Sequence, residues 1–195
     1  GEMFLVMEYC SLGSLLDFLR RLKEDTVLMQ NDFLNIALQV AAGCVFMEQR
    51  KVVHRDLSAR NLLVVNVDGK YSVKIADLGM AREINNDSSQ YEASSETALP
   101  VKWSPPEVLE FGKFSHKSDV WSFGVVLWEI FNYGKVPYAG MSNAEVTSYV
   151  VNGGRLAKPQ NCPEEVYQIM SKCWAKVESQ RPSFKEIFDC LKEIT

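Results

Sequence analysis

Apolar residues recur along most of this chain with the spacing of amphipathic helices. The pattern is clearest between positions 33 and 47, where apolar residues at i, i+3, i+4, i+7, i+11 and i+14 form one stripe. Such a stripe predicts a long helix that buries one face. An earlier helix is expected after Ser14, because Ser14 and Asp17 stand at the spacing of a capping box and an apolar run follows them.

The second half of the chain predicts four further helices. Segment 117–133 is apolar nearly all round, which is typical of a helix at the centre of a core. The other three have N-terminal signals, namely two capping boxes and a proline at the helix start. These signals are Ser142 with Glu145, Ser183 with Glu186, and Pro163.

The β signals are fewer and come early. Two β-rich runs, Leu62–Val67 and Lys70–Ile75, flank the dipeptide Asp68-Gly69, which predicts a hairpin with a two-residue turn. Residues 5–7 have the pattern of a buried strand end. Between 85 and 98 the only large apolar residue is Tyr91, so we expect an exposed, mobile loop there. With no repeat or linker, residues 1–195 are expected to form a single, mainly α domain with a small β element.

Composition narrows the function classes. The chain is 47% hydrophobic and 24% charged, as in folded proteins, and its net charge of −4 argues against nucleic acid or an anionic membrane as its main partner. Its five cysteines form no C-x-x-C pair, which favours free thiols in a reducing compartment. The most apolar stretch, 120–131, is too short to cross a bilayer, and the first residues lack the features of a signal peptide. We therefore expect a cytoplasmic location.

Three polar side chains around the predicted hairpin indicate chemistry. Asp56 and Asn61 lie just before it, and Asp77 lies just after it, sixteen residues beyond Asn61. Oxygen atoms of Asn61 and Asp77 suit Mg²⁺, which takes few protein ligands beside substrate phosphates. Asp56 would then be available to accept a proton from an attacking hydroxyl group. Each short motif is common by chance, but the ordered set is specific.

Over essentially its whole length the chain resembles the catalytic domain of protein kinases, and among them the tyrosine kinases. The motifs that carry the resemblance include the catalytic loop, the magnesium-binding D-F-G, the A-P-E and the central and closing helices. His54-Arg55-Asp56 with Asn61 is similar to the catalytic loop, Asp77-Leu78-Gly79 to D-F-G and Pro105-Pro106-Glu107 to A-P-E. Ser118 to Gly124 is similar to the central helix, and Cys173-Trp174 and Arg181-Pro182 are similar to the closing helices. The resemblance implies a kinase-like large lobe with the preceding hinge.

The resemblance also implies roles for single residues. Asp56 would orient and deprotonate the acceptor, and Asn61 and Asp77 would hold Mg²⁺ on the phosphates of ATP. An adenine site would comprise the backbone of Glu8 and Cys10, Met7 as gatekeeper and Leu63 as the floor. Ser14 has two interpretations, as a ribose contact or as the helix cap. Structural roles are implied for His54 and Leu78 beneath the site, Glu107 paired with Arg181, and Asp119 bracing the loop.

The same comparison indicates tyrosine as the acceptor. Serine/threonine kinases carry a lysine two residues after the catalytic aspartate, whereas this chain has Ser58 there and Arg60 two residues later. Leu99 to Trp103 resembles the substrate platform of tyrosine kinases, with Pro100 supporting a phenol ring. Substrates would therefore be proteins or peptides that bear tyrosine. Phosphorylation of Tyr91 would let its phosphate pair with Arg55, with Arg82 as a second candidate partner, and order the loop.

The sequence departs from the family pattern at two motif positions and in the small-lobe motifs that it lacks. Leu78 replaces the usual phenylalanine, and Pro105 replaces the usual alanine. The Gly-rich loop, the strand lysine and the helix glutamate of the small lobe are absent from the sequence and would precede Gly1. We expect this piece alone to be nearly inactive. Two alternatives stay open: a pseudokinase that serves as a scaffold, and a serine/threonine or dual-specificity kinase.

Overall fold

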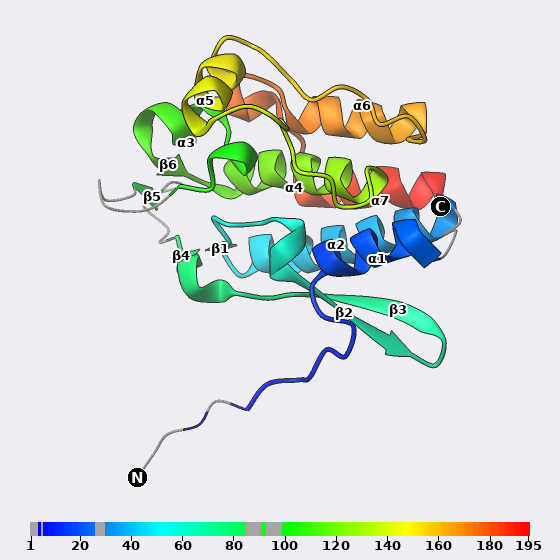
Figure 1. The fold of residues 1–195 in the computed structure, drawn as a ribbon. Coiled ribbons are helices and arrows are strands. Elements are labelled where there is room, and N and C mark those ends of the chain that lie inside the picture. The colour runs from blue at the N-terminus through cyan, green and yellow to red at the C-terminus, as the bar shows by residue number, and fades with distance from the viewer. Residues whose placement is uncertain (1–3, 5, 26–29, 85–90, 93–98) are drawn as a thin grey trace.

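The computed structural model describes residues 4, 6–25, 30–84, 91–92 and 99–195. Helices dominate this part of the chain, and several short 3₁₀ turns connect them (Figure 1). The α-helices are α1 (Leu15–Asp25), α2 (Gln30–Gln49), α3 (Pro106–Phe111), α4 (His116–Phe131), α5 (Asn143–Val151), α6 (Glu164–Cys173) and α7 (Phe184–Ile194). The strands are β1 (Val52–Val53), β2 (Leu62–Val67), β3 (Lys70–Ile75), β4 (Arg82–Glu83), β5 (Tyr91–Glu92) and β6 (Lys113–Phe114).

The helix starts follow the local signals in the sequence. Ser142 and Ser183 form complete capping boxes with Glu145 and Glu186 at the starts of α5 and α7. Ser14 accepts a hydrogen bond from the backbone N–H of Asp17 and donates one to its carboxylate. These contacts satisfy N–H groups that have no partner within the helix, so the predicted starts are confirmed.

The predicted hairpin forms with the expected register. β2 and β3 are antiparallel, with Leu62 opposite Ile75 and Val67 opposite Lys70. The turn residues Asp68 and Gly69 have φ angles of 50° and 82°. Two successive positive φ angles match the right-handed twist of the strands, which explains why this dipeptide closes the hairpin.

The core is built around α4. Figure 1 shows α4 and α7 in a middle layer, with α6 on one side and α1, α2 and the β2–β3 hairpin on the other. α4 is buried over almost its whole circumference, and Trp121 and Phe123 have no exposed surface. α2 packs against α7 and β3. The expectation of a mainly helical fold with a central apolar helix is confirmed, and no helix within the described residues could span a bilayer.

Two expectations need correction. Val6 and Met7 were expected in a buried strand, but they are 91% and 75% exposed, and within the described residues no strand pairs with them. They lie on an extended arm that leads away from the helices (Figure 1). The expected loop at 85–98 falls largely outside the described residues. Tyr91–Glu92, however, form β5 and pair with β6, so this part is a strand rather than an irregular loop.

A buried ion pair joins the start of α3 to the segment that precedes α7. The guanidinium of Arg181, 2% exposed, donates to both carboxylate oxygens of Glu107 at 2.6 and 2.8 Å. It also donates to the backbone oxygens of Ala175 and Lys117 and lies over the ring of Trp121. The expected pairing of Glu107 with Arg181 is therefore present, and it ties the start of α3 to the segment before α7.

Removing one charge of this pair should destabilise the protein strongly. We expect Glu107→Gln to lower the free energy of unfolding by about 3 kcal/mol, because it leaves a buried guanidinium without its counter-charge. Urea denaturation measures this change. Asp189→Asn is the matched control, since the exposed Lys185–Asp189 pair on α7 should contribute about 0.5 kcal/mol or less. Equal effects of the two variants would contradict the prediction.

Candidate active site

The hairpin brings Asn61 and Asp77 to the same place. The N–H of Ala76, the residue before Asp77, donates to the backbone oxygen of Asn61 at 2.9 Å. Asp77 therefore lies one residue beyond the pair that closes the open end of the hairpin. Nε2 of His54 lies 3.0 Å from the oxygen of Ala76 and links the preceding loop to the same point. His54 is 1% exposed, as expected of a residue beneath the site.

The Asp56 carboxylate is held from two sides. Arg60 donates to its Oδ1 at 2.5 Å. Nδ2 of Asn61 donates to its Oδ2 and to the backbone oxygen of Asp56, both at 2.8 Å. Three of the residues singled out in the sequence thus form one connected group. The Asp56 side chain is 14% exposed, so it is reachable from solvent while its orientation is restricted.

Asp77 has a constrained backbone. Its φ of 53° lies in the left-handed region, which residues other than glycine seldom adopt. Its carboxylate accepts a hydrogen bond from the N–H of Gly79 at 3.4 Å, at the start of a 3₁₀ turn (Leu78–Met80). Leu78, expected to pack beneath the site, is instead 56% exposed. That expectation is wrong for this structure, because the turn after Asp77 directs Leu78 outward rather than into the core.

The loop at residues 54–61 is braced by Asp119 of α4. The two oxygens of Asp119 accept hydrogen bonds from the backbone N–H groups of His54 and Arg55 at 2.7 and 3.0 Å. Arg55 has a φ of 71°, so the carboxylate holds a strained turn in place. Burial raises the pKa of Asp119 to about 6, although these hydrogen bonds act in the opposite direction. The bracing position expected for Asp119 is what the structure shows.

A second carboxylate of α4 reaches the same loop, and the sequence analysis did not identify it. Oε2 of Glu129 accepts hydrogen bonds from the N–H of Ala59 at 3.0 Å and from Nε1 of Trp103 at 2.9 Å. Burial raises the pKa of Glu129 to about 7, against the effect of these bonds and of Arg60 and Arg20. The available signal was a glutamate within the apolar run 123–131.

The residues expected around adenine are brought together only in part. The segment after Cys10 is bonded to β2, with Leu12 donating to Val64 and Val64 donating to Gly13. Ser14 and Leu63 form a β-bridge and are neighbours, and the backbone oxygen of Cys10 accepts the N–H of Gly13 at 3.1 Å in the turn that leads to Ser14. Both hydrogen bonds of Ser14 described above cap α1, which favours the cap over the ribose contact.

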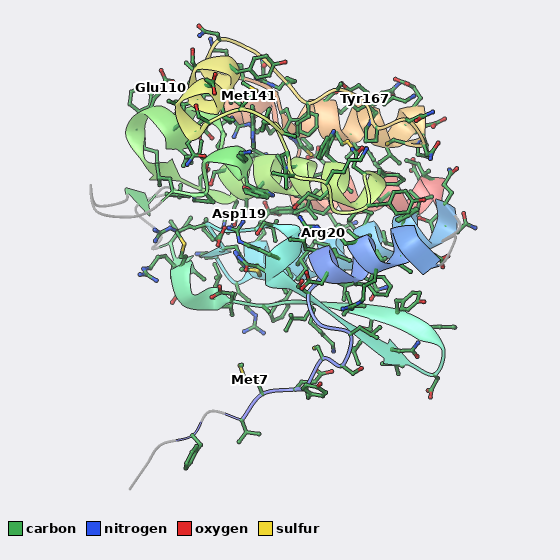
Figure 2. All side chains as sticks on the ribbon, in the orientation of Figure 1. Met7, Arg20, Glu110, Asp119, Met141 and Tyr167 are labelled. Carbon is green, nitrogen blue, oxygen red and sulfur yellow. The ribbon has the colours of Figure 1, made fainter. Side chains whose placement is uncertain are left out.

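Met7 and Glu8 belong to the N-terminal arm. Figure 2 shows Met7 on this arm, away from the helices. Glu8 pairs with Lys74 of β3 at 3.3 Å between exposed side chains. The structure therefore places Glu8 near the hairpin, but it does not bring Met7 against the other residues expected around adenine.

The expected substrate platform contacts the loop through Trp103. Pro100 precedes the 3₁₀ turn Val101–Trp103, and its oxygen accepts a hydrogen bond from Oγ of Ser104 at 3.0 Å. The guanidinium of Arg60 lies 4.8 Å from the centre of a Trp103 ring. Of Tyr91 only the backbone is described, in β5 opposite Phe114. The guanidinium of Arg55 lies 4.8 Å from the centre of the Phe114 ring, so the Arg55 side chain contacts the β6 residue that pairs with Tyr91.

The raised pKa of Glu129 predicts a pH-dependent stability. Between about pH 4.5 and pH 7 the native carboxyl retains a proton that the unfolded chain releases, so stability falls as the pH rises through this window. From pH 6 to pH 7 the loss should be about 1 kcal/mol, and Glu129→Gln should abolish this contribution. Urea denaturation of both proteins at the two pH values measures it. An unchanged slope in the variant would contradict the prediction.

The sequence is similar to those of known protein kinases. The family model of the protein tyrosine and serine/threonine kinases matches residues 1–191. The chain is 43% identical over 188 residues to the tyrosine-protein kinase Btk of Drosophila melanogaster, covering 96% of this chain and 23% of that protein. It is 42% identical to the tyrosine-protein kinase Fer of Mus musculus over 192 residues and of Homo sapiens over 193 residues, covering 98% of this chain and 22% of each relative.

The chain thus spans less than a quarter of the length of these relatives. The family match nevertheless covers nearly all of its residues, including the loop at 54–61, the hairpin and α4. Sequence similarity and the geometry around Asp56 lead to one conclusion: the chain belongs to the protein tyrosine and serine/threonine kinase family, with tyrosine kinase catalytic domains among its relatives.

Proposed function

We propose that residues 1–195 form the hinge and large lobe of a protein tyrosine kinase, which transfers the γ-phosphate of ATP to tyrosine hydroxyls of protein substrates. The observation that carries the proposal is the meeting of Asp56, Asn61 and Asp77 at the open end of the hairpin. A carboxylate oriented by a guanidinium and an amide, together with a second carboxylate on the residue that follows Ala76, suits phosphoryl transfer at a metal-bound nucleotide.

In the proposed reaction Asp56 is the base. The phenol oxygen of the substrate attacks the γ-phosphorus, its proton passes to the Asp56 carboxylate, and ADP leaves with the electrons of the broken P–O bond. Arg60 and Asn61 restrict the carboxylate to one orientation, which supports its role in aligning the hydroxyl. Arg60 also supplies positive charge near the transferred group.

Asn61 and Asp77 fit a magnesium site. The hydrogen bonds described for the Asn61 side chain are donated by Nδ2, which leaves Oδ1 suited to a cation. Asp77 contributes a carboxylate whose described hydrogen bond, to Gly79, is long at 3.4 Å. Hard oxygen ligands of this kind match Mg²⁺, which would neutralise charge on the phosphates when bound.

The remaining assignments follow from position and resemblance. Cys10 and Leu63 would contact adenine, with Met7 and Glu8 completing the site once a small lobe, carried by residues that precede this chain, covers the N-terminal arm. The exposure of Phe4, Val6 and Met7, each at least 75% exposed, supports a covering partner for this arm. Pro100 and Trp103 would support the substrate tyrosine. The free thiols are consistent with a cytoplasmic location of this domain.

The test uses the parent protein, extended upstream by the residues of the proposed small lobe. We expect it to phosphorylate a poly-Glu-Tyr peptide with ATP and Mg²⁺, and we expect Asp56→Asn to lower kcat by about 10³-fold or more, because the base is lost. A radiometric assay of phosphotyrosine measures both.

Asp189→Asn, on the exposed face of α7, is the control and should leave the rate unchanged. Phosphorylation of serine peptides instead of tyrosine peptides would indicate the serine/threonine alternative. Binding of ATP and Mg²⁺ without turnover in the wild type would contradict the proposal and favour the pseudokinase.

We further propose that Tyr91 is a phosphorylation site that raises activity. A phosphate there would add about −1.5 to −2 charge, which the Arg55 guanidinium can attract. In the extended wild-type protein we expect a lag in peptide phosphorylation that preincubation with ATP removes, whereas in Tyr91→Phe preincubation should have no effect and the final rate should be several-fold lower. Time courses with and without preincubation measure this, and identical time courses for wild type and variant would contradict the assignment.

A further inference from the structure

We propose that Glu129 is a positioning residue for phosphoryl transfer: it fixes Trp103 against the loop at 54–61 and thereby sets the place of Arg60 beside Asp56. This inference rests on the proposed kinase function. Among the described residues, the side-chain hydrogen bonds of Glu129 go to Ala59 and Trp103 rather than to the expected metal ligands, and the sequence motifs assign it no role.

The anchor is a single oxygen shared by two segments. Oε2 of Glu129 accepts the N–H of Ala59, in the loop that bears Asp56, at 3.0 Å. It also accepts Nε1–H of Trp103, in the segment expected to support the substrate, at 2.9 Å. Glu129 is 1% exposed and belongs to the most deeply buried helix. The loop that bears Asp56 and the segment that contains Trp103 are thus held by the same buried carboxylate oxygen.

Trp103 transmits this position to Arg60. The guanidinium of Arg60 lies 4.8 Å from the Trp103 ring centre and donates to Oδ1 of Asp56 at 2.5 Å. The Arg60 side chain is 40% exposed, so without the ring beside it many rotamers would be open to it. The Trp103 ring is itself held by Glu129, and its backbone oxygen accepts a hydrogen bond from Oγ of Ser122 at 2.8 Å.

Packing alone does not explain a carboxylate at position 129. Leu127 and Ile130, close to it along α4, are apolar and have no exposed surface. An apolar side chain of similar volume would avoid the cost of burying a charge. What only an oxygen provides is acceptance of the two N–H groups, which would otherwise be buried without a partner. We infer that the two hydrogen bonds, rather than packing, account for a glutamate at this position.

The test compares two substitutions of Glu129 in the extended parent protein. Glu129→Met fills a similar volume without an acceptor, whereas Glu129→Gln retains one oxygen that can accept both bonds. We expect Glu129→Met to lower kcat for peptide phosphorylation by about 100-fold through displacement of Arg60, with the KM for ATP changed less than about threefold. The Glu129→Gln variant should keep kcat within about threefold of wild type.

Trp103→Phe provides a second measurement should the methionine variant fail to fold. It keeps an aromatic ring for Arg60 but removes the N–H, so kcat should fall while the KM for ATP is unchanged. Glu193→Met, at an exposed position on α7, is the matched control and should behave as wild type.

The outcomes separate the two proposals. An active wild type, with E129M and Trp103→Phe equally active per folded molecule, would overturn the positioning role alone. Equal losses in E129M and E129Q would also overturn it, because the charge rather than the hydrogen bonds would then be required. A wild type without tyrosine kinase activity would overturn the proposed function, and the inference with it.

Discussion

Two buried carboxylates on one helix hold the loop on which the rest of the site depends. Asp119 accepts the N–H groups of His54 and Arg55 near one end of the loop, and Glu129 accepts the N–H of Ala59 near the other. Because ten residues of α-helix advance about 15 Å, positions 119 and 129 can span the loop from one rigid element. The strained backbone of Arg55 persists because this support is in place.

This arrangement requires charge to be buried, and the structure shows the consequence. The pKa values of Asp119 and Glu129 are both raised because burial disfavours their ionised forms, while the backbone and indole N–H groups partly offset that effect. Carboxylates in such a place contribute less to stability than apolar residues would. Their contribution is instead to the geometry of the loop, since each accepts bonds from groups that hydrophobic packing could not orient.

The hairpin provides the second half of the site by a simpler means. Its antiparallel register returns the chain to its starting point, so Asn61 and Asp77 meet although they are far apart in sequence. Asn61 then serves two neighbours at once, with Nδ2 on Asp56 and Oδ1 left for a cation in the proposed function. Loop and hairpin are thereby joined at Asn61, whose side chain bonds Asp56 and whose backbone oxygen accepts the N–H of Ala76, beside the contact of His54 Nε2 with the backbone oxygen of Ala76.

Local signals in the sequence were sufficient for the helix starts, the hairpin turn and the set of Asp56, Asn61 and Asp77, because caps, turns and motifs depend on residues close in the chain. The exposure of Leu78 and Met7, the pairing of Tyr91–Glu92 with Lys113–Phe114, and the hydrogen bonds of Glu129 were decided by tertiary structure. Each depends on which distant segment lies alongside, and a glutamate in an apolar helix acquires its partners only when two other segments fold against it.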